Sequence, residues 1–314
     1  MNLLWQFFRL SSPLYGLIAA GYLVARLPGW RHEWTHRITA FVFAVPLPAM
    51  LFHLMSHRAS LPPVDGRVLI AYFGSCLIVF VIGRIIGAWL FRLDGTAQSV
   101  FGLGGIYSNI VLTGLAIAKL TLGAAVVPVV ALLLVFNALI LWTLVSVSIE
   151  WSRHGAFTPA GFVHTALSVL KNPFILAILG GTAFGRLGLS LPPMADAALG
   201  AVGSVAGPTA MITLGMGLAT FSLNQEWGSG LAVCALKLLV QPLVVWLLAI
   251  ALGLPALELR AVVLVASMAV GVNVYLMSLQ FQALQRTIAS SVVLSNILAA
   301  FTTPVLLTAL HSVN

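Results

Sequence analysis

Long apolar runs separated by short polar breaks fill almost the whole chain. A helix needs roughly 20 predominantly apolar residues to cross the hydrocarbon layer of a bilayer. The breaks therefore predict about ten crossings, near residues 12–27, 36–56, 67–91, 98–119, 124–149, 171–188, 196–221, 230–252, 258–279 and 287–310. The pattern predicts an all-α integral membrane protein.

The expected spans form two groups of five, separated by the longest polar stretch. We expect residues 1–150 to form a first five-helix repeat, 151–170 a connecting loop and 171–314 a second repeat. Landmarks recur in the same order 160 positions apart: Pro13, Gly21, Arg26, Leu27 and Pro48 return as Pro173, Gly181, Arg186, Leu187 and Pro208. Five is an odd number, so the second half must begin on the opposite side of the membrane. This predicts two inverted repeats, as in secondary transporters.

Composition and charge narrow the class of protein. Hydrophobic residues make up 61% of the chain and charged residues 7%, against about 25% charged in soluble domains. The net charge is +8, but the 15 Lys and Arg residues are scattered singly, which does not indicate a nucleic-acid surface. Nine of them lie with loops 1–2, 3–4, 5–6, 7–8 and 9–10. The positive-inside rule then predicts a cytoplasmic connecting loop and both termini outside.

One basic residue, Lys237, lies about seven residues inside the eighth span. We expect its long side chain to snorkel to the cytoplasmic surface, and we counted it with loop 7–8 for that reason. The alternative is that it attracts an anion. All seven acidic residues fall in loops or at span ends, so the sequence does not indicate a proton relay or a carboxylate sodium site at mid-membrane.

Glycine and asparagine gather in the fourth and ninth spans. Residues 102–109 read GLGGIYSN and residues 271–275 read GVNVY. Such sequences let the backbone leave helical geometry, and an unwound segment survives in lipid only where protein or a water-filled cavity satisfies it. If both spans break at mid-membrane, the N-termini of the half-helices present partial positive charge to an anion.

Polar residues recur at equivalent places in the two halves. Asn109 is followed by Asn273 after 164 positions, and Asn137 by Asn296 after 159. We expect a substrate site formed by Ser108, Asn109, Thr113, Gly271, Asn273 and Tyr275, with Asn137 and Asn296 as additional polar lining. The alternative is that these amides only join helices, as polar side chains often do in membranes. Neither a catalytic residue nor a cofactor is expected.

One motif favours a different class of protein. Residues 32–36 read HEWTH, which on a helix would place the zinc ligands His32 and His36 on one face with Glu33 as the base. Asp94 in Leu93-Asp94-Gly95 resembles the third ligand of intramembrane zinc proteases. Because the motif lies in a polar loop at a helix entrance, we expect no metal there. His53 and His57, also four apart, are interpreted in the same way, as the polar end of the second span.

Several segments resemble the auxin efflux carrier family, whose bacterial members are permeases for small organic acids. The matching segments are Val42–Phe52, Tyr107–Asn109 with Gly114 and Leu115, Asn172 with Pro173, Pro208 with Leu214 and Gly215, and Ser267–Tyr275. The resemblance implies five-plus-five inverted repeats whose fourth and ninth spans cross unwound. It places Ser108 and Asn109 at the first crossing and Gly271, Val272 and Asn273 at the second, and by analogy it implies a homodimer. Ala116 and Ala269 stand where the family usually has proline.

The sequence therefore predicts a permease of the bacterial inner membrane that carries a small organic anion, such as a carboxylate, by alternating access. Its expected partners are that anion and the lipid bilayer. Two alternatives remain open. One is an intramembrane zinc protease that uses His32, Glu33 and His36. The other is a channel or receptor on the same scaffold.

Overall fold

The structure is a computed structural model that describes residue 13 and residues 16–57, 65–110, 114–154, 173–219 and 227–311. Its elements within these ranges are helices, and no strand is formed there, which confirms the all-α class. By length and composition, four helical stretches in the described ranges could cross a membrane: Arg67–Trp89, Pro193–Gly217, Trp227–Ala251 and Gln285–Leu310. A shorter apolar helix, Gly16–Ala25, lies within the first expected span, residues 12–27.

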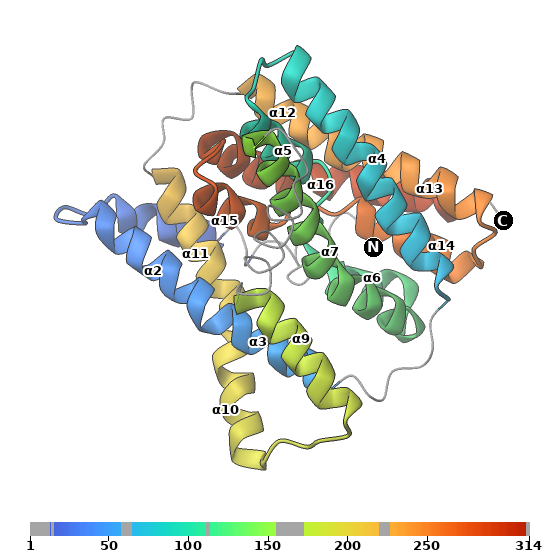
Figure 1. Ribbon diagram of the computed structural model, residues 1–314, viewed down its shortest axis with the longest axis horizontal. Coiled ribbons are helices and arrows are strands. Elements are labelled where there is room, and N and C mark those ends of the chain that lie inside the picture. Colours follow the sequence, from blue (N-terminus) through green and yellow to red (C-terminus); the bar gives the residue numbers. More distant parts are fainter. Residues whose placement is uncertain are drawn as a thin grey trace.

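Figure 1 shows the helices, coloured in chain order. The first half contains α2 (His32–Ala44), α3 (Pro46–Ser56), α4 (Arg67–Trp89), α5 (Gly95–Gly104), α6 (Leu115–Leu122), the 3₁₀ turn η3 (Ala124–Val126) and α7 (Val127–His154). The second half contains α9 (Pro173–Arg186), α10 (Pro193–Ser204), α11 (Ala206–Ala219), α12 (Trp227–Ala235), the π-helical turn η4 (Leu236–Val240), α13 (Gln241–Ala251), α14 (Ala256–Ala266), α15 (Val272–Gln280) and α16 (Gln285–His311).

Proline accounts for two irregularities within these helices. Helix α2 ends at Ala44 and α3 begins at Pro46, where the missing N–H and the ring of proline disfavour a continuous helix. The π-helical turn η4 directly precedes Gln241 and Pro242. A proline inside a helix disturbs the hydrogen bonds of the preceding turn, and π-helical turns of this kind often occur at functional sites.

The helices pack as two groups (Figure 1). The lateral group consists of the helix Gly16–Ala25 with α2, α3, α9, α10 and α11, in which α3 packs against both α9 and α10. The central group consists of α4 to α7 and α12 to α16, in which α4 packs against α5 and α13. Contacts between the groups run from α11 to α15 and α16, and from α7 to α9.

Glycines allow the helix Gly16–Ala25 to touch the backbone of α11. A Cβ atom built on Gly215 would lie 1.9 Å from the carbonyl oxygen of Ile18, and one on Gly21 would lie 2.0 Å from that of Ile212. Helix interfaces in membranes are rich in such small residues because they permit close backbone packing.

Two of the expected spans are interrupted. Helix α5 ends at Gly104 and α6 begins at Leu115, while α14 ends at Ala266 and α15 begins at Val272. Both spans leave helical geometry near their glycines, as expected, and Gly271 has an extended backbone. The described glycines with positive φ, which are Gly29, Gly123, Gly188 and Gly253, all lie elsewhere. Glycines at the end of α5 also permit close packing. A Cβ atom on Gly102 would lie 2.9 Å from the Phe80 carbonyl oxygen, and one on Gly104 would lie 2.8 Å from Val233 Cγ1.

Candidate functional site

The two interrupted segments meet through their backbones, and we call residues 105–110 and 267–271 the crossing. Asn109 N donates to the Ala269 carbonyl oxygen at 3.0 Å, and Gly271 N donates to that of Tyr107 at 2.8 Å. Ser108 and Val270 form an antiparallel bridge between these bonds. The crossing thus supplies hydrogen bonds that the broken helices no longer make, as burial requires.

Helix α16 supports the second segment of the crossing. The Ser295 hydroxyl accepts a hydrogen bond from Val270 N at 2.9 Å, and the Thr303 hydroxyl donates to the Ser267 carbonyl oxygen at 3.0 Å. Both hydroxyls are fully buried. The interruption at Ala269 is therefore held by hydrogen bonds from the backbone and from α16, without the proline that the family usually has.

Helices α4 and α13 support the first segment. Tyr72 in α4 donates from its hydroxyl to Ser108 Oγ at 3.0 Å. Gln241, the first residue of α13, donates from Nε2 to the Ile106 carbonyl oxygen at 3.0 Å. Both Tyr72 and Gln241 are fully buried, so these contacts are shielded from water.

Two asparagine side chains contact the side chain of Tyr107. Asn273 Nδ2 donates to the Tyr107 hydroxyl at 3.0 Å, from the first turn of α15. Asn137, in α7, is also hydrogen-bonded to the Tyr107 side chain. The Asn137 Oδ1 atom is buried and has no hydrogen-bond partner in the structure. The cluster therefore keeps polar capacity that its protein contacts do not use.

The expected site residues divide between the crossing and its surroundings. Ser108, Asn109 and Gly271 lie in the crossing, and Asn273 lies beside it in the first turn of α15. Thr113 lies outside the described residues.

Two of the expected residues point elsewhere. A Cβ atom on Gly217 would lie 1.8 Å from the Tyr275 hydroxyl, so this side chain packs against α11 in the lateral group. Asn296 Nδ2 donates to the Val292 carbonyl oxygen at 2.7 Å, within its own helix. Asn296 therefore differs from Asn137, although the sequence treated the two alike.

Lys237 corrects an expectation. Its exposed fraction is 0%, and Nζ donates to the carbonyl oxygen of Ala266, the last residue of α14. The side chain turns toward the end of α14 and does not snorkel to the surface. No ion pair links it to an acidic residue in the described part of the chain. The partial negative charge of a helix C-terminus favours a cation at this place.

Some contributors to the crossing were not among the expected site residues. Gln241 is a polar residue in an apolar run, a signal that the sequence offers, but no asparagine or glutamine stands about 160 positions before it, so the pairing that selected Asn137 did not select it. Ser295 and Thr303 carry no comparable signal, because single hydroxyls are common in membrane helices, where they bond to their own backbone. Only the fold shows that these two hydroxyls reach the crossing.

The zinc motif does not assemble a site in the described part of the chain. Asp94 Oδ1 accepts a hydrogen bond from Ala97 N at 2.8 Å, so this carboxylate caps the N-terminus of α5. His36 is exposed, and the three-ligand group found among the described residues contains neither His36 nor Asp94. The structure therefore gives no support to the protease hypothesis.

Comparisons with known proteins indicate that the chain is related to transporters. A family model described as "Membrane transport protein" matches residues 10–307. The chain is 26% identical over 309 residues to a protein of Rhizobium meliloti (strain 1021) named "Putative malonate transporter", with 96% of this chain and 95% of that protein covered. The family and the name of this relative indicate a transporter rather than an enzyme. The apolar helices and the family match make the chain a multi-pass membrane protein. Because the family model matches almost its whole length, the chain belongs to the membrane transport protein family, which is the auxin efflux carrier family that its motifs resemble.

Proposed function

We propose that this protein is a secondary carrier that moves a small organic anion, a carboxylate, across the bacterial inner membrane by alternating access around the crossing. The observation that carries the proposal is the buried Lys237, which donates a hydrogen bond to the last residue of α14, where the second of the two spans is interrupted. Buried ionisable residues in membrane proteins are costly and usually mark the path of a substrate or ion.

The charges around the crossing favour an anion. Helix α6 follows the first segment of the crossing along the chain and α15 follows the second, and a helix N-terminus carries about half a positive charge. Lys237 adds a full charge when protonated, and the buried residues of the described chain include no Asp or Glu. An anion entering here would meet positive potential without a competing carboxylate.

The polar groups at the crossing suit a carboxylate. Amide groups and hydroxyls, such as those of Asn109, Asn273 and Ser108, offer donors without a fixed charge. Asn137, whose amide oxygen is unpartnered, would offer its Nδ2 donors if the amide turned by 180°. We assign Thr113 to the same site. The relative is named for malonate, so a short dicarboxylate is the first substrate to test.

For the architecture we propose ten spans in two inverted five-helix repeats, 1–150 and 171–314. The connecting loop 151–170 would lie in the cytoplasm and both termini outside. The lateral and central groups would move against each other, as the rocking of one bundle against another requires. Tyr275, packed on Gly217, lies where these groups touch, so we assign it to the moving interface beside the site. Asn296 would stabilise α16.

The test is transport by purified protein in liposomes. Radiolabelled malonate should enter by a saturable process, and unlabelled mono- and dicarboxylates should compete while neutral sugars of similar size do not. Liposomes without protein give the background. A conductive flux that does not saturate would indicate a channel. Binding of carboxylates without any exchange across the membrane would indicate a receptor, and either result would reject the carrier.

A further inference from the structure

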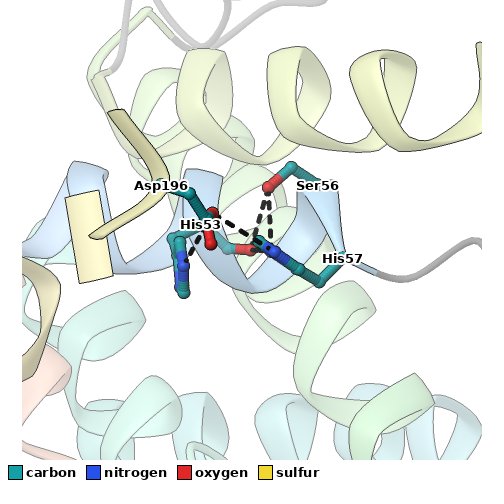
Figure 2. Close-up of polar contacts among 4 residues, drawn as sticks. All are labelled: His53, Ser56, His57 and Asp196. Carbon is teal, nitrogen blue, oxygen red and sulfur yellow. Dashed lines mark hydrogen bonds and ion pairs between the residues drawn. The ribbon is translucent and has the colours of Figure 1, made fainter. Parts of the chain in front are cut away.

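Three potential metal ligands converge where α3 ends and α10 begins (Figure 2). The Nε2 atoms of His53 and His57 each lie 3.2 Å from Oδ1 of Asp196. His53 and His57 stand four residues apart, which places them on one face of a helix, and Asp196 lies in the first turn of α10. The ligand atoms of all three residues lie within 4.8 Å of one another.

The hydrogen bonds of His57 fix which of its nitrogens carries a proton. Nδ1 lies 2.9 Å from the His53 carbonyl oxygen, which can only accept. The Ser56 hydroxyl donates to the same oxygen at 3.0 Å, so it does not compete as a donor to Nδ1. A neutral His57 therefore carries its proton on Nδ1 and directs the lone pair of Nε2 toward Asp196.

Asp196 Oδ1 makes this arrangement unfavourable unless a cation is present. This oxygen atom is buried and accepts no hydrogen bond in the structure, yet the imidazole nitrogens face it. A neutral His57 would direct the lone pair of Nε2 at this oxygen atom with no positive charge between them. Either protons on the histidines or one shared metal ion removes this repulsion.

The distances match a metal ion. Zinc binds histidine nitrogen and carboxylate oxygen at about 2.0–2.2 Å in tetrahedral geometry, so neighbouring ligand atoms are roughly 3.3 Å apart. The two distances from a histidine Nε2 atom to Asp196 Oδ1, both 3.2 Å, agree with this spacing. Metal-binding histidines also donate their second N–H to a carbonyl or carboxylate, as His57 does to the His53 carbonyl oxygen.

The surrounding packing holds the ligands in place. A Cβ atom on Gly200 would lie 3.4 Å from His53 Nε2, and one on Gly203 would lie 2.8 Å from the Met50 Cα atom. Helices α3 and α10 are therefore in close contact beside the cluster. The side chains of His53 and Asp196 remain 33% and 35% exposed, which leaves a route for an ion to enter.

We propose that His53, His57 and Asp196 bind a divalent transition-metal ion of the zinc class, with water as a fourth ligand. The ion joins α3 to α10 inside the lateral group and is separate from the crossing. It has no catalytic task. Its effect is to fix these two helix ends to each other.

The test uses the full-length protein, without a histidine tag, in detergent. Zinc binding is measured by competition with a fluorescent zinc indicator, and thermal unfolding is followed with and without zinc. We expect one zinc ion per chain and a higher unfolding temperature with zinc, since a ligand that binds only the folded state stabilises it. His53→Gln, His57→Gln and Asp196→Asn should each weaken binding tenfold or more. His36 is exposed on α2 and follows His32 by four residues, the spacing that also separates His57 from His53. His36→Gln is therefore the matched control and should not weaken zinc binding.

Cobalt provides a second measurement that does not depend on stability. Cobalt bound in tetrahedral geometry should give visible absorption bands in the wild-type protein and the His36→Gln variant, and these bands should be lost in Asp196→Asn. Wild-type protein that binds no more zinc than Asp196→Asn would overturn the proposal. So would a loss of zinc binding in His36→Gln that equals the loss in His53→Gln. In either case the cluster is an ion pair of protonated histidines.

Discussion

The Nδ2 atom of Asn273 donates a hydrogen bond to the hydroxyl of Tyr107 at 3.0 Å, although 166 residues separate them in the sequence. The amide of Asn273 thus has Tyr107 as its partner across the crossing. The sequence had paired Asn273 with Asn109. The backbone explains the difference, because Gly271 N donates to the Tyr107 carbonyl oxygen and so places the start of α15 beside Tyr107.

Removing the Tyr107 hydroxyl should lower stability while leaving the ring in place. A net hydrogen bond contributes about 0.5–1.5 kcal/mol, so Tyr107→Phe should destabilise the protein by about that amount. Thermal unfolding in detergent measures the change. Tyr22→Phe, whose hydroxyl accepts from the Arg26 side chain in an exposed position, is the control and should change stability less. Equal effects of the two changes would show that the buried hydrogen bond contributes no more to stability than the exposed one.

The amides of Asn109 and Asn273 should affect substrate affinity more than stability. A hydrogen bond to a charged group contributes about 1.5–3 kcal/mol, so Asn109→Ala and Asn273→Ala should each weaken carboxylate binding roughly 10- to 150-fold. Malonate competition in liposomes measures this. Asn296→Ala is the matched control, because its amide bonds to its own helix. If all three variants lose stability but keep their affinity, the amides only join helices.

Lys237 should determine the preference for an anion. Lys237→Met keeps the length of the side chain and removes the charge, and we expect malonate affinity to fall at least tenfold, which is about 1.4 kcal/mol. Stability should change little, because the desolvation cost of a buried charge disappears together with its hydrogen bond. Lys119→Met, at an exposed lysine of α6, is the control. Unchanged malonate uptake by Lys237→Met would remove Lys237 from the proposed site.

The sequence predicted α4, α7 and α16 well because the signal of a long apolar helix is local. Apolar runs and their polar breaks lie close to the observed ends of α4, α7 and α16. The interruption before α15 was also visible, since Gly271 and Asn273 are poor helix formers.

What the sequence could not predict depends on contacts between distant segments. Lys237 was expected at the surface because a basic residue near the end of a span usually snorkels. The π-helical turn and the carbonyl oxygen of Ala266, 29 residues away, direct it inward instead. The histidines His53 and His57 were visible as a pair, but nothing in their spacing pointed to Asp196.

The next prediction concerns the orientation of the protein in the membrane. The burial of Lys237 makes an experiment necessary, because it reduces the charge difference on which the predicted orientation rests. Without this buried lysine, eight of the nine counted basic residues remain on the side assigned to the cytoplasm, against six on the other. A cysteine at Ser152 should react with a membrane-impermeant thiol reagent only from the cytoplasm, and one at Ser312 only from outside. The native Cys76 and Cys234 are buried, so the background should be low. The reverse pattern would invert the proposed topology.

The contact between the helix Gly16–Ala25 and α11 leaves no room for a methyl group, which gives a sharp test of the packing in the lateral group. Gly215→Ala would bring Cβ to 1.9 Å from the Ile18 carbonyl oxygen, so the helices must separate. Overpacking typically costs 1–3 kcal/mol, and a backbone clash belongs at the upper end of that range. Gly16→Ala is the matched control, because a Cβ atom there meets nothing within 4 Å.

The control should be neutral or stabilising, since alanine is favoured over glycine in a helix by about 1 kcal/mol. Thermal unfolding of the two purified variants measures both effects. We expect Gly215→Ala to unfold several degrees below the wild-type protein and Gly16→Ala at or above it. Equal unfolding temperatures for the two variants would mean that the backbones of the helix Gly16–Ala25 and α11 do not touch in the membrane protein. The assignment of that helix to the lateral group would then fail.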